Sequence, residues 1–149
     1  MSITMTRIRS ERGAALLEAA ITVPIILLIS VGIFEFGRAY QTWQVLTNAA
    51  REGARIAILE GPTDADVRLR VNEYLAIGGL CKSKTECQPD GNIVINRMVP
   101  LTDSSTASKV EIDYPFEFMV LNPIVRLVVK DSTTGAPITM PVSSVMRNE

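Results

Sequence analysis

The sequence predicts an α+β protein in which a long N-terminal helix crosses a membrane and then packs on a small antiparallel sheet, with one extra short helix. Three observations carry this prediction. Residues 13–34 form an apolar run, small and apolar residues keep helical spacing as far as residue 57, and apolar and polar residues alternate after residue 92. A chain of 149 residues has room for one compact domain and one membrane segment.

The apolar run, GAALLEAAITVPIILLISVGIF, carries a single charge, Glu18. At about 1.5 Å per residue its helix would be roughly 30 Å long, which matches the hydrocarbon core of a bilayer. A signal peptide usually has a shorter apolar core that ends in a small-residue cleavage site, whereas this run passes directly into residues 35–38, so we predict a retained membrane helix. Arg7, Arg9 and Arg12 precede the run and predict a cytoplasmic N-terminus.

The helical pattern continues beyond the run, and no proline occurs between Pro24 and Pro62. We therefore predict one continuous helix of about 45 residues, with a kink or a loosened turn at Pro24, which lacks a backbone N–H. Ala49, Gly53 and Ala57 recur every four residues and would allow close approach of either a partner helix or the chain's own sheet.

Two acidic residues lie in or beside the apolar run. Glu18 is close enough to its start to extend to the membrane surface without a role, but acidic residues inside spanning helices are usually functional. Glu35 lies at the outer margin, between Phe34 and Phe36, and is predicted to have an interfacial role only.

A short second helix is predicted after Pro62. Thr63 and Asp66 have the spacing of a capping box, apolar residues follow as far as Ile77, and a Gly-Gly pair ends the segment. Asp64 and Asp66 could suggest a cation site, but no further acidic ligands follow at EF-hand spacing, so we interpret them as the acidic first turn of the helix.

Strands are predicted from residue 92 onward, after a turn at residues 89–92. Alternation at residues 93–95 and 110–118 predicts strands with one buried face, and Pro115 predicts an edge strand or a bulge. Residues 124–129 and 138–145 would flank a hairpin loop at residues 131–137. The result would be a sheet of three or four antiparallel strands on the outer half of the long helix.

Composition argues against several classes of function. The net charge of −1 and the absence of histidine speak against a nucleic-acid-binding face and against imidazole chemistry. We find no convergent cluster of polar groups and predict no enzyme, no cofactor, no metal site and no small-molecule substrate. Cys81 and Cys87 are too few for a zinc site, and in an oxidising compartment they would form a disulfide; two free thiols are the alternative.

The N-terminal third resembles a known family. Arg12-Gly13 followed by AALLE and an unbroken apolar helix is similar to the processing site of type IV pilin-like precursors. ERGAALLEAAITVPIILLISVGIFEFGRAY and the continuation TNAAREGARIA resemble the TadE-like minor pilins of the tight-adherence (Tad, type IVc) pilus system, and residues 143–149 resemble that family's C-terminal strand.

This resemblance implies that a membrane prepilin peptidase cleaves after Gly13 and leaves Ala14 as the new N-terminus. It also implies that the Glu18 carboxylate compensates the terminal amine of a neighbouring subunit and thereby sets the assembly register. Tad pilins often carry an aromatic residue after this glutamate, and Ala19 in its place argues against the major pilin.

The resemblance implies the following organisation: residues 1–13 a cytoplasmic leader, 14–37 the transmembrane helix, 38–60 its periplasmic continuation, and 61–149 a periplasmic pilin-like α+β domain. The expected protein is a single-pass inner-membrane minor pilin or pseudopilin that joins or primes an adhesive extracellular pilus. Its expected partners are the peptidase, other pilin-like subunits and the inner-membrane assembly platform. The alternatives are a membrane-anchored periplasmic interaction module with an uncleaved leader, and a type II secretion pseudopilin.

Overall fold

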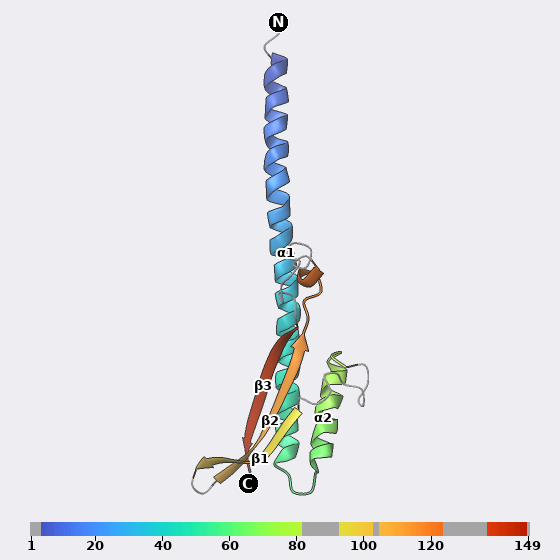
Figure 1. Ribbon diagram of the computed structural model, residues 1–149, viewed down its shortest axis with the longest axis vertical. Coiled ribbons are helices and arrows are strands. Elements are labelled where there is room, and N and C mark those ends of the chain that lie inside the picture. The colour runs from blue at the N-terminus through green and yellow to red at the C-terminus, as the bar shows by residue number, and fades with distance from the viewer. Residues whose placement is uncertain (1–3, 82–92, 103–104, 124–136, 149) are drawn as a thin grey trace.

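The computed structural model describes residues 4–81, 93–102, 105–123 and 137–148. One helix, α1 (Thr4–Ala57), runs along the molecule, and the other elements gather around its C-terminal half (Figure 1). These elements are the helix α2 (Asp64–Ile77) and the strands β1 (Ile93–Thr102), β2 (Ser105–Phe116) and β3 (Ile138–Arg147). The predicted α+β class is confirmed: a long apolar helix, a small antiparallel sheet and one short extra helix.

The helix α1 is longer than predicted, since it begins at Thr4 and continues without interruption past Gly13. It also continues through Pro24. Figure 1 shows no sharp bend along α1, so the predicted kink is wrong, and the alternative, a loosened turn at Pro24, stays a prediction. Proline removes one hydrogen bond, the one its N–H would donate to the carbonyl of Ala20. The backbone hydrogen bonds of α1 before and after Pro24 keep the helix axis straight.

Both ends of α2 are formed by the residues that the sequence indicated. The hydroxyl of Thr63 accepts from the N–H of Asp66 while the Asp66 carboxylate accepts from the N–H of Thr63, which confirms the capping box. At the other end Gly79 has a φ of 75°, and the N–H of Leu80 donates to the carbonyl of Leu75 at 2.9 Å. This is a Schellman ending, which needs glycine because other residues rarely adopt a positive φ.

The described strands form one antiparallel sheet in the order β1-β2-β3, with Ile95 opposite Val110 and Ile112 opposite Val142. The irregularities in pairing occur within β1 and not at Pro115. Pro115 lies in the central strand, so its assignment to an edge strand or bulge is wrong.

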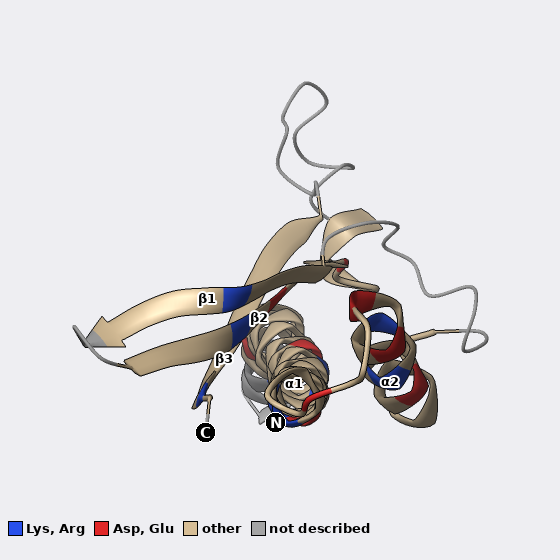
Figure 2. Cartoon of the chain, turned by 90° about the horizontal axis from the view of Figure 1, so that it is seen from below, with Lys and Arg blue, Asp and Glu red and all other residues tan. Residues whose placement is uncertain are grey.

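The core lies where α1 meets the sheet on one side and α2 on another (Figure 2). Small residues of α1 meet branched residues of α2 and of the sheet there. The buried core residues are Leu46, Ala49, Ala50, Ala54 and Ala57 of α1, Val67, Val71 and Leu75 of α2, and Val110, Ile112 and Val142 of the sheet. The N-terminal half of α1 takes no part in this core.

Three predictions fall outside the described residues: the turn at residues 89–92, the strand at 124–129 and most of the hairpin loop at 131–137. The strand predicted at residues 138–145 is confirmed as β3 and extends to Arg147.

Candidate membrane and assembly site

The N-terminal half of α1 projects from the domain as a bare apolar rod. Every residue from Arg12 to Ser30 is exposed, and large apolar side chains point outward all round the helix. Among the described residues α1 is the one helix that is long and apolar enough to cross a membrane. A rod of this kind is not stable in water, because burial of apolar surface is the main favourable term in folding. The arrangement therefore indicates single-pass membrane anchoring.

Gly13, Ala14 and Glu18 all lie on this exposed rod. Ala14 and Glu18 are four residues apart and therefore share one face of α1, about 6 Å apart along its axis. A Cβ atom built on Gly13 would meet no atom within 4 Å. The fold itself therefore does not require glycine at this position, and any requirement for glycine must come from another molecule.

Glu35 is the residue that sequence reasoning judged wrongly. Its side chain is fully buried, accepts a hydrogen bond from the backbone N–H of Val120 and forms an ion pair with Arg38 at 3.4 Å. The predicted role as a purely interfacial residue is wrong, because the carboxylate fastens the chain that follows β2 to α1. A Glu and an Arg three residues apart at the end of an apolar run are the signal that could have found the pair; Val120, 85 positions away, could not be found this way.

Arg38 completes this junction. Its guanidinium also donates to the carbonyl of Glu117 at 3.1 Å and lies over the ring of Phe116, 5.1 Å from the centroid. Buried charge is costly unless it is paired and hydrogen-bonded, and here both requirements are met. The end of the membrane rod and the end of the central strand are thus fixed to each other.

Gly53 marks a close approach between α1 and the rest of the domain. A Cβ atom at this position would lie 2.6 Å from a methyl group of Val71 in α2 and 3.3 Å from a methyl group of Val110 in β2. Ala49 and Ala57 are buried on the same face. The small-residue spacing therefore serves packing within the chain, against both a helix and the sheet, which was one of the two interpretations of the sequence.

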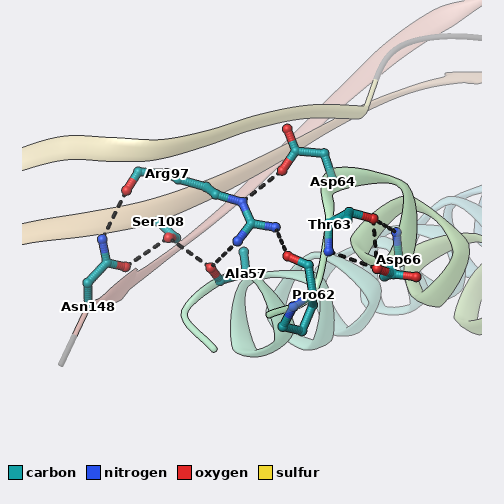
Figure 3. A network of polar contacts seen from close by, with 8 residues as sticks. All are labelled: Ala57, Pro62, Thr63, Asp64, Asp66, Arg97, Ser108 and Asn148. Carbon is teal, nitrogen blue, oxygen red and sulfur yellow. Dashed lines mark hydrogen bonds and ion pairs between the residues drawn. The ribbon is translucent and has the colours of Figure 1, made fainter. Parts of the chain in front are cut away.

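A polar network closes the domain at the far end of α1 (Figure 3). The guanidinium of Arg97 in β1 donates to the carbonyl of Ala57 at 3.2 Å, to the carbonyl of Pro62 at 2.7 Å and to the carboxylate of Asp64 at 2.7 Å. The last turn of a helix leaves carbonyls without intrahelical donors, and Arg97 satisfies one of them. Asp64 lies in the first turn of α2, as predicted, and is in addition the ion-pair partner of Arg97, which was not predicted.

The same network includes the C-terminal end of the chain. The amide of Asn148 donates to the carbonyl of Arg97 at 2.9 Å, and its oxygen lies 2.8 Å from the hydroxyl of Ser108. Near the start of α2, hydrogen bonds from the side chain and backbone of Thr63 lower the pKa of Asp66. Both aspartates of this helix start are therefore engaged by groups of the chain itself.

Charged residues also connect the two helices. Glu52 of α1 accepts from Arg55 on the same helix and from Arg70 of α2, at 2.9 and 3.0 Å. The hydrogen bond from Arg55 is the main cause that lowers the pKa of Glu52 to about 2, with Arg70 adding to it against the opposing effect of burial. Arg70 also pairs with Glu73 at 3.0 Å.

Cys81 follows the end of α2 and packs partly buried against the core. Cys87 lies outside the described residues, so the predicted disulfide between the two stays a prediction.

These features define a class: a small α+β domain carried on one continuous helix whose exposed half can anchor it in a membrane. A protein-family model described as TadE-like protein matches residues 13–55. The match confirms the resemblance seen in the sequence, is consistent with a TadE-like protein, and indicates a protein associated with the Tad pilus. No curated protein and no solved structure matches the chain.

The extent of the match is informative. It begins at Gly13 and ends at Arg55, two residues before α1 ends, and it covers less than a third of the chain. The similarity to the family therefore lies in the long helix, including the face that packs on the sheet. The domain formed by α2 and the three strands lies outside it.

Proposed function

We propose that this chain is a minor pilin or pseudopilin of the Tad pilus system, with a structural role in assembly or initiation and no catalytic activity. The observation that carries the proposal is the rod of α1: apolar all round from Leu16 to Phe34, bare in the isolated chain, and charged only at Glu18. Such a rod suits two successive environments, the bilayer and then a bundle of like helices, since both bury it on every side.

The position of Glu18 supports a role in helix bundling. Cleavage after Gly13 would create an amine on Ala14, and Ala14 shares a face of α1 with Glu18. In a dry bundle an amine and a carboxylate are each costly alone and are stabilised when paired. An amine of one subunit beside Glu18 of the next would fix the stagger between their helices.

The continuity of α1 supports transmission of that stagger to the domain. The helix is unbroken from the rod into the core, and Glu35 and Arg38 fasten the end of β2 to it. A register set in the apolar bundle would therefore also set the position of the domain along a fibre.

Processing is the first test. Mass spectrometry of the protein from its native membrane should find Ala14 as the first residue when an active prepilin peptidase is present. Gly13→Leu should retain the leader while leaving the fold intact, because the position has open space around it. An intact leader on the wild-type chain would contradict the proposal and favour an unprocessed, membrane-anchored interaction module.

Assembly is the second test. Glu18→Gln should be processed and inserted normally but lost from the sheared pilus fraction, or should reduce piliation if the subunit acts in initiation. Ser30→Ala is the matched control, because it also removes a polar group from the rod, one bonded only to the carbonyl of Ile26 within α1. Equal piliation in both variants would contradict a register role for Glu18. Association with a type II secretion complex in place of a pilus would identify the alternative pseudopilin.

A further inference from the structure

Residues 117–123 follow β2 and lie beside α1 where the rod ends (Figure 1). They are held there by the hydrogen bond from the N–H of Val120 to Glu35 and by that from Arg38 to the carbonyl of Glu117. The segment is therefore fixed to α1 at a known level, the first turn beyond Phe34.

That level can be compared with the dimensions of a bilayer. The helix rises 1.5 Å per residue, so Glu35 and Arg38 lie about 2 and 6 Å beyond Phe34, the last residue of the apolar run. The headgroup zone on each side of the hydrocarbon core is roughly 5 to 7 Å thick. If the rod spans the bilayer, Glu35 and Arg38 lie in the headgroup zone. Residues 117–123 then lie there too, because they are hydrogen-bonded to these two side chains.

The side chains at this level suit such a zone. Met119 is 65% exposed, and Phe118 packs edge-on against the exposed Phe36, with ring centroids 6.5 Å apart. Tyr40, one turn further along α1, is also exposed. Tyrosine, with an apolar ring and a hydrated hydroxyl, is typical of membrane surfaces. Phe36, Phe118 and Met119 continue the apolar surface of the rod without belonging to the core.

Polar groups accompany them. A groove of about 530 Å³ is lined by three polar residues, Arg38, Glu117 and Asn122, and by three apolar ones, Phe118, Met119 and Pro123. Hydrogen-bonding groups and apolar surface therefore meet at one depth, as they do in the interfacial region of a bilayer.

We propose that residues 117–123, together with Phe36 and Tyr40, form a second membrane contact that rests in the lipid headgroup zone at the C-terminal end of the rod. This contact would hold the domain at one height and one rotation relative to the bilayer before assembly. The proposal rests on membrane anchoring of α1 and not on the pilus role, so either can fail without the other.

The chain contains a matched pair of reporters for the test. Met98 in β1 is 84% exposed, comparable to Met119, but follows Arg97, which bonds to the far end of α1 at Ala57. Full-length protein would be placed at one copy per lipid nanodisc and treated with a bulky water-soluble oxidant, and sulfoxide formation at each methionine would be followed by mass spectrometry. Met98 should be oxidised several-fold faster than Met119.

A second measurement uses fluorescence. Because Trp43 is the single tryptophan, Trp43→Phe provides a dark background into which Met119→Trp or Met98→Trp is introduced. Lipids brominated near the headgroup should quench most of the emission of the Met119→Trp variant and little of that of the Met98→Trp variant.

Equal oxidation of the two methionines, or equal quenching of the two variants, would overturn the proposal. Protection of Met119 that appears only in discs with several copies would also overturn the proposal, since a neighbouring chain, and not lipid, would then cover Met119. The oxidation experiment needs no variant and decides the matter if Met119→Trp does not fold.

Discussion

The two halves of α1 form one continuous helix but are built for different surroundings. From Arg12 to Ser30 every residue is exposed, many of them large and apolar, whereas from Leu46 to Ala57 the buried face consists mainly of alanine and glycine. In the first half, stability must come from lipid or from other helices around the rod. In the second, it comes from α2 and the sheet, which reach the helix backbone because the side chains between them are small.

The same contrast applies to acidic residues. Glu18 is exposed on the rod, and Glu35, at the boundary, is fully buried and bonded to Val120 and Arg38. One carboxylate is therefore available to another molecule, and the other is already used by the chain's own fold. The two residues are of the same type, and they differ in their position relative to the domain: Glu18 lies far from it and Glu35 lies against it.

The largest effect on the fold is expected from Glu35→Ala. The change removes the acceptor of the Val120 N–H and the ion-pair partner of Arg38, which should lower the free energy of unfolding by about 3 kcal/mol. Urea unfolding of the detergent-solubilised protein, followed by the fluorescence of Trp43, measures the change. Glu18→Gln should leave the same transition unmoved, and a comparable loss in both variants would contradict the distinction between the two carboxylates.

A second comparison uses one substitution at two glycines of α1. Gly53→Ala should destabilise the domain by about 2 kcal/mol, because the new methyl group would lie 2.6 Å from Val71. Gly37→Ala should stabilise the helix by about 0.5 kcal/mol, because its Cβ meets no atom within 4 Å and alanine is the better helix former. The midpoint of thermal unfolding, monitored by circular dichroism, should fall for Gly53→Ala and rise for Gly37→Ala. A shift of the same sign in both variants would show that the close approach at Gly53 does not determine the effect of the added methyl group.

Elements defined by local signals could be predicted from the sequence. The capping box of Thr63 and Asp66, the glycine ending after Ile77 and the alternation around Val110 each depend on residues close together in the chain. The spacing of Ala49, Gly53 and Ala57 predicted close approach but not which element approaches, because any flat surface fits small residues.

Contacts between distant segments could not be predicted in this way. The hydrogen bond between Glu35 and Val120 joins positions 85 residues apart, and Arg97 reaches Ala57 across 40 residues. Pro115 was misplaced because whether β2 is a central or an edge strand depends on the strands that pair with it, and not on its own sequence. Of the candidate site, Gly13 and Ala14 were predicted by resemblance and Glu18 both by resemblance and as the one charge in the apolar run, while the junction at Glu35 required the structure.

Arg97→Ala should lower the free energy of local opening at the C-terminal end of α1, where the helix packs on the domain, by about 1 to 2 kcal/mol. The change leaves the carbonyls of Ala57 and Pro62 without their arginine donor and removes the ion pair with Asp64. Hydrogen exchange of the full chain should show faster exchange at the end of α1 and the start of α2, with the rod unchanged. Faster exchange along the whole of α1 would indicate that the two halves are not independent in stability.

The smallest expected effect is the dependence of stability on pH, which arises from Glu52 in the half of α1 that packs on the domain. Because the folded state holds the pKa of Glu52 at about 2, below its ordinary value of 4.5, the interaction with Arg55 and Arg70 stabilises the fold above pH 4.5 and is lost as the pH falls from 4.5 toward 2. The contribution should be about 1 kcal/mol, less than the full shift implies, since the arginine side chains are 58% and 42% exposed.

Glu52→Gln isolates this contribution from that of Asp66, whose pKa is also lowered. The difference in the free energy of unfolding between wild type and Glu52→Gln should be greatest at neutral pH and should decline between pH 4.5 and 2. High salt should reduce it at neutral pH, because the arginines are partly exposed. A difference that stays constant down to pH 2 would mean that Glu52 contributes through packing, and the charged link between α1 and α2 would then have no role in stability.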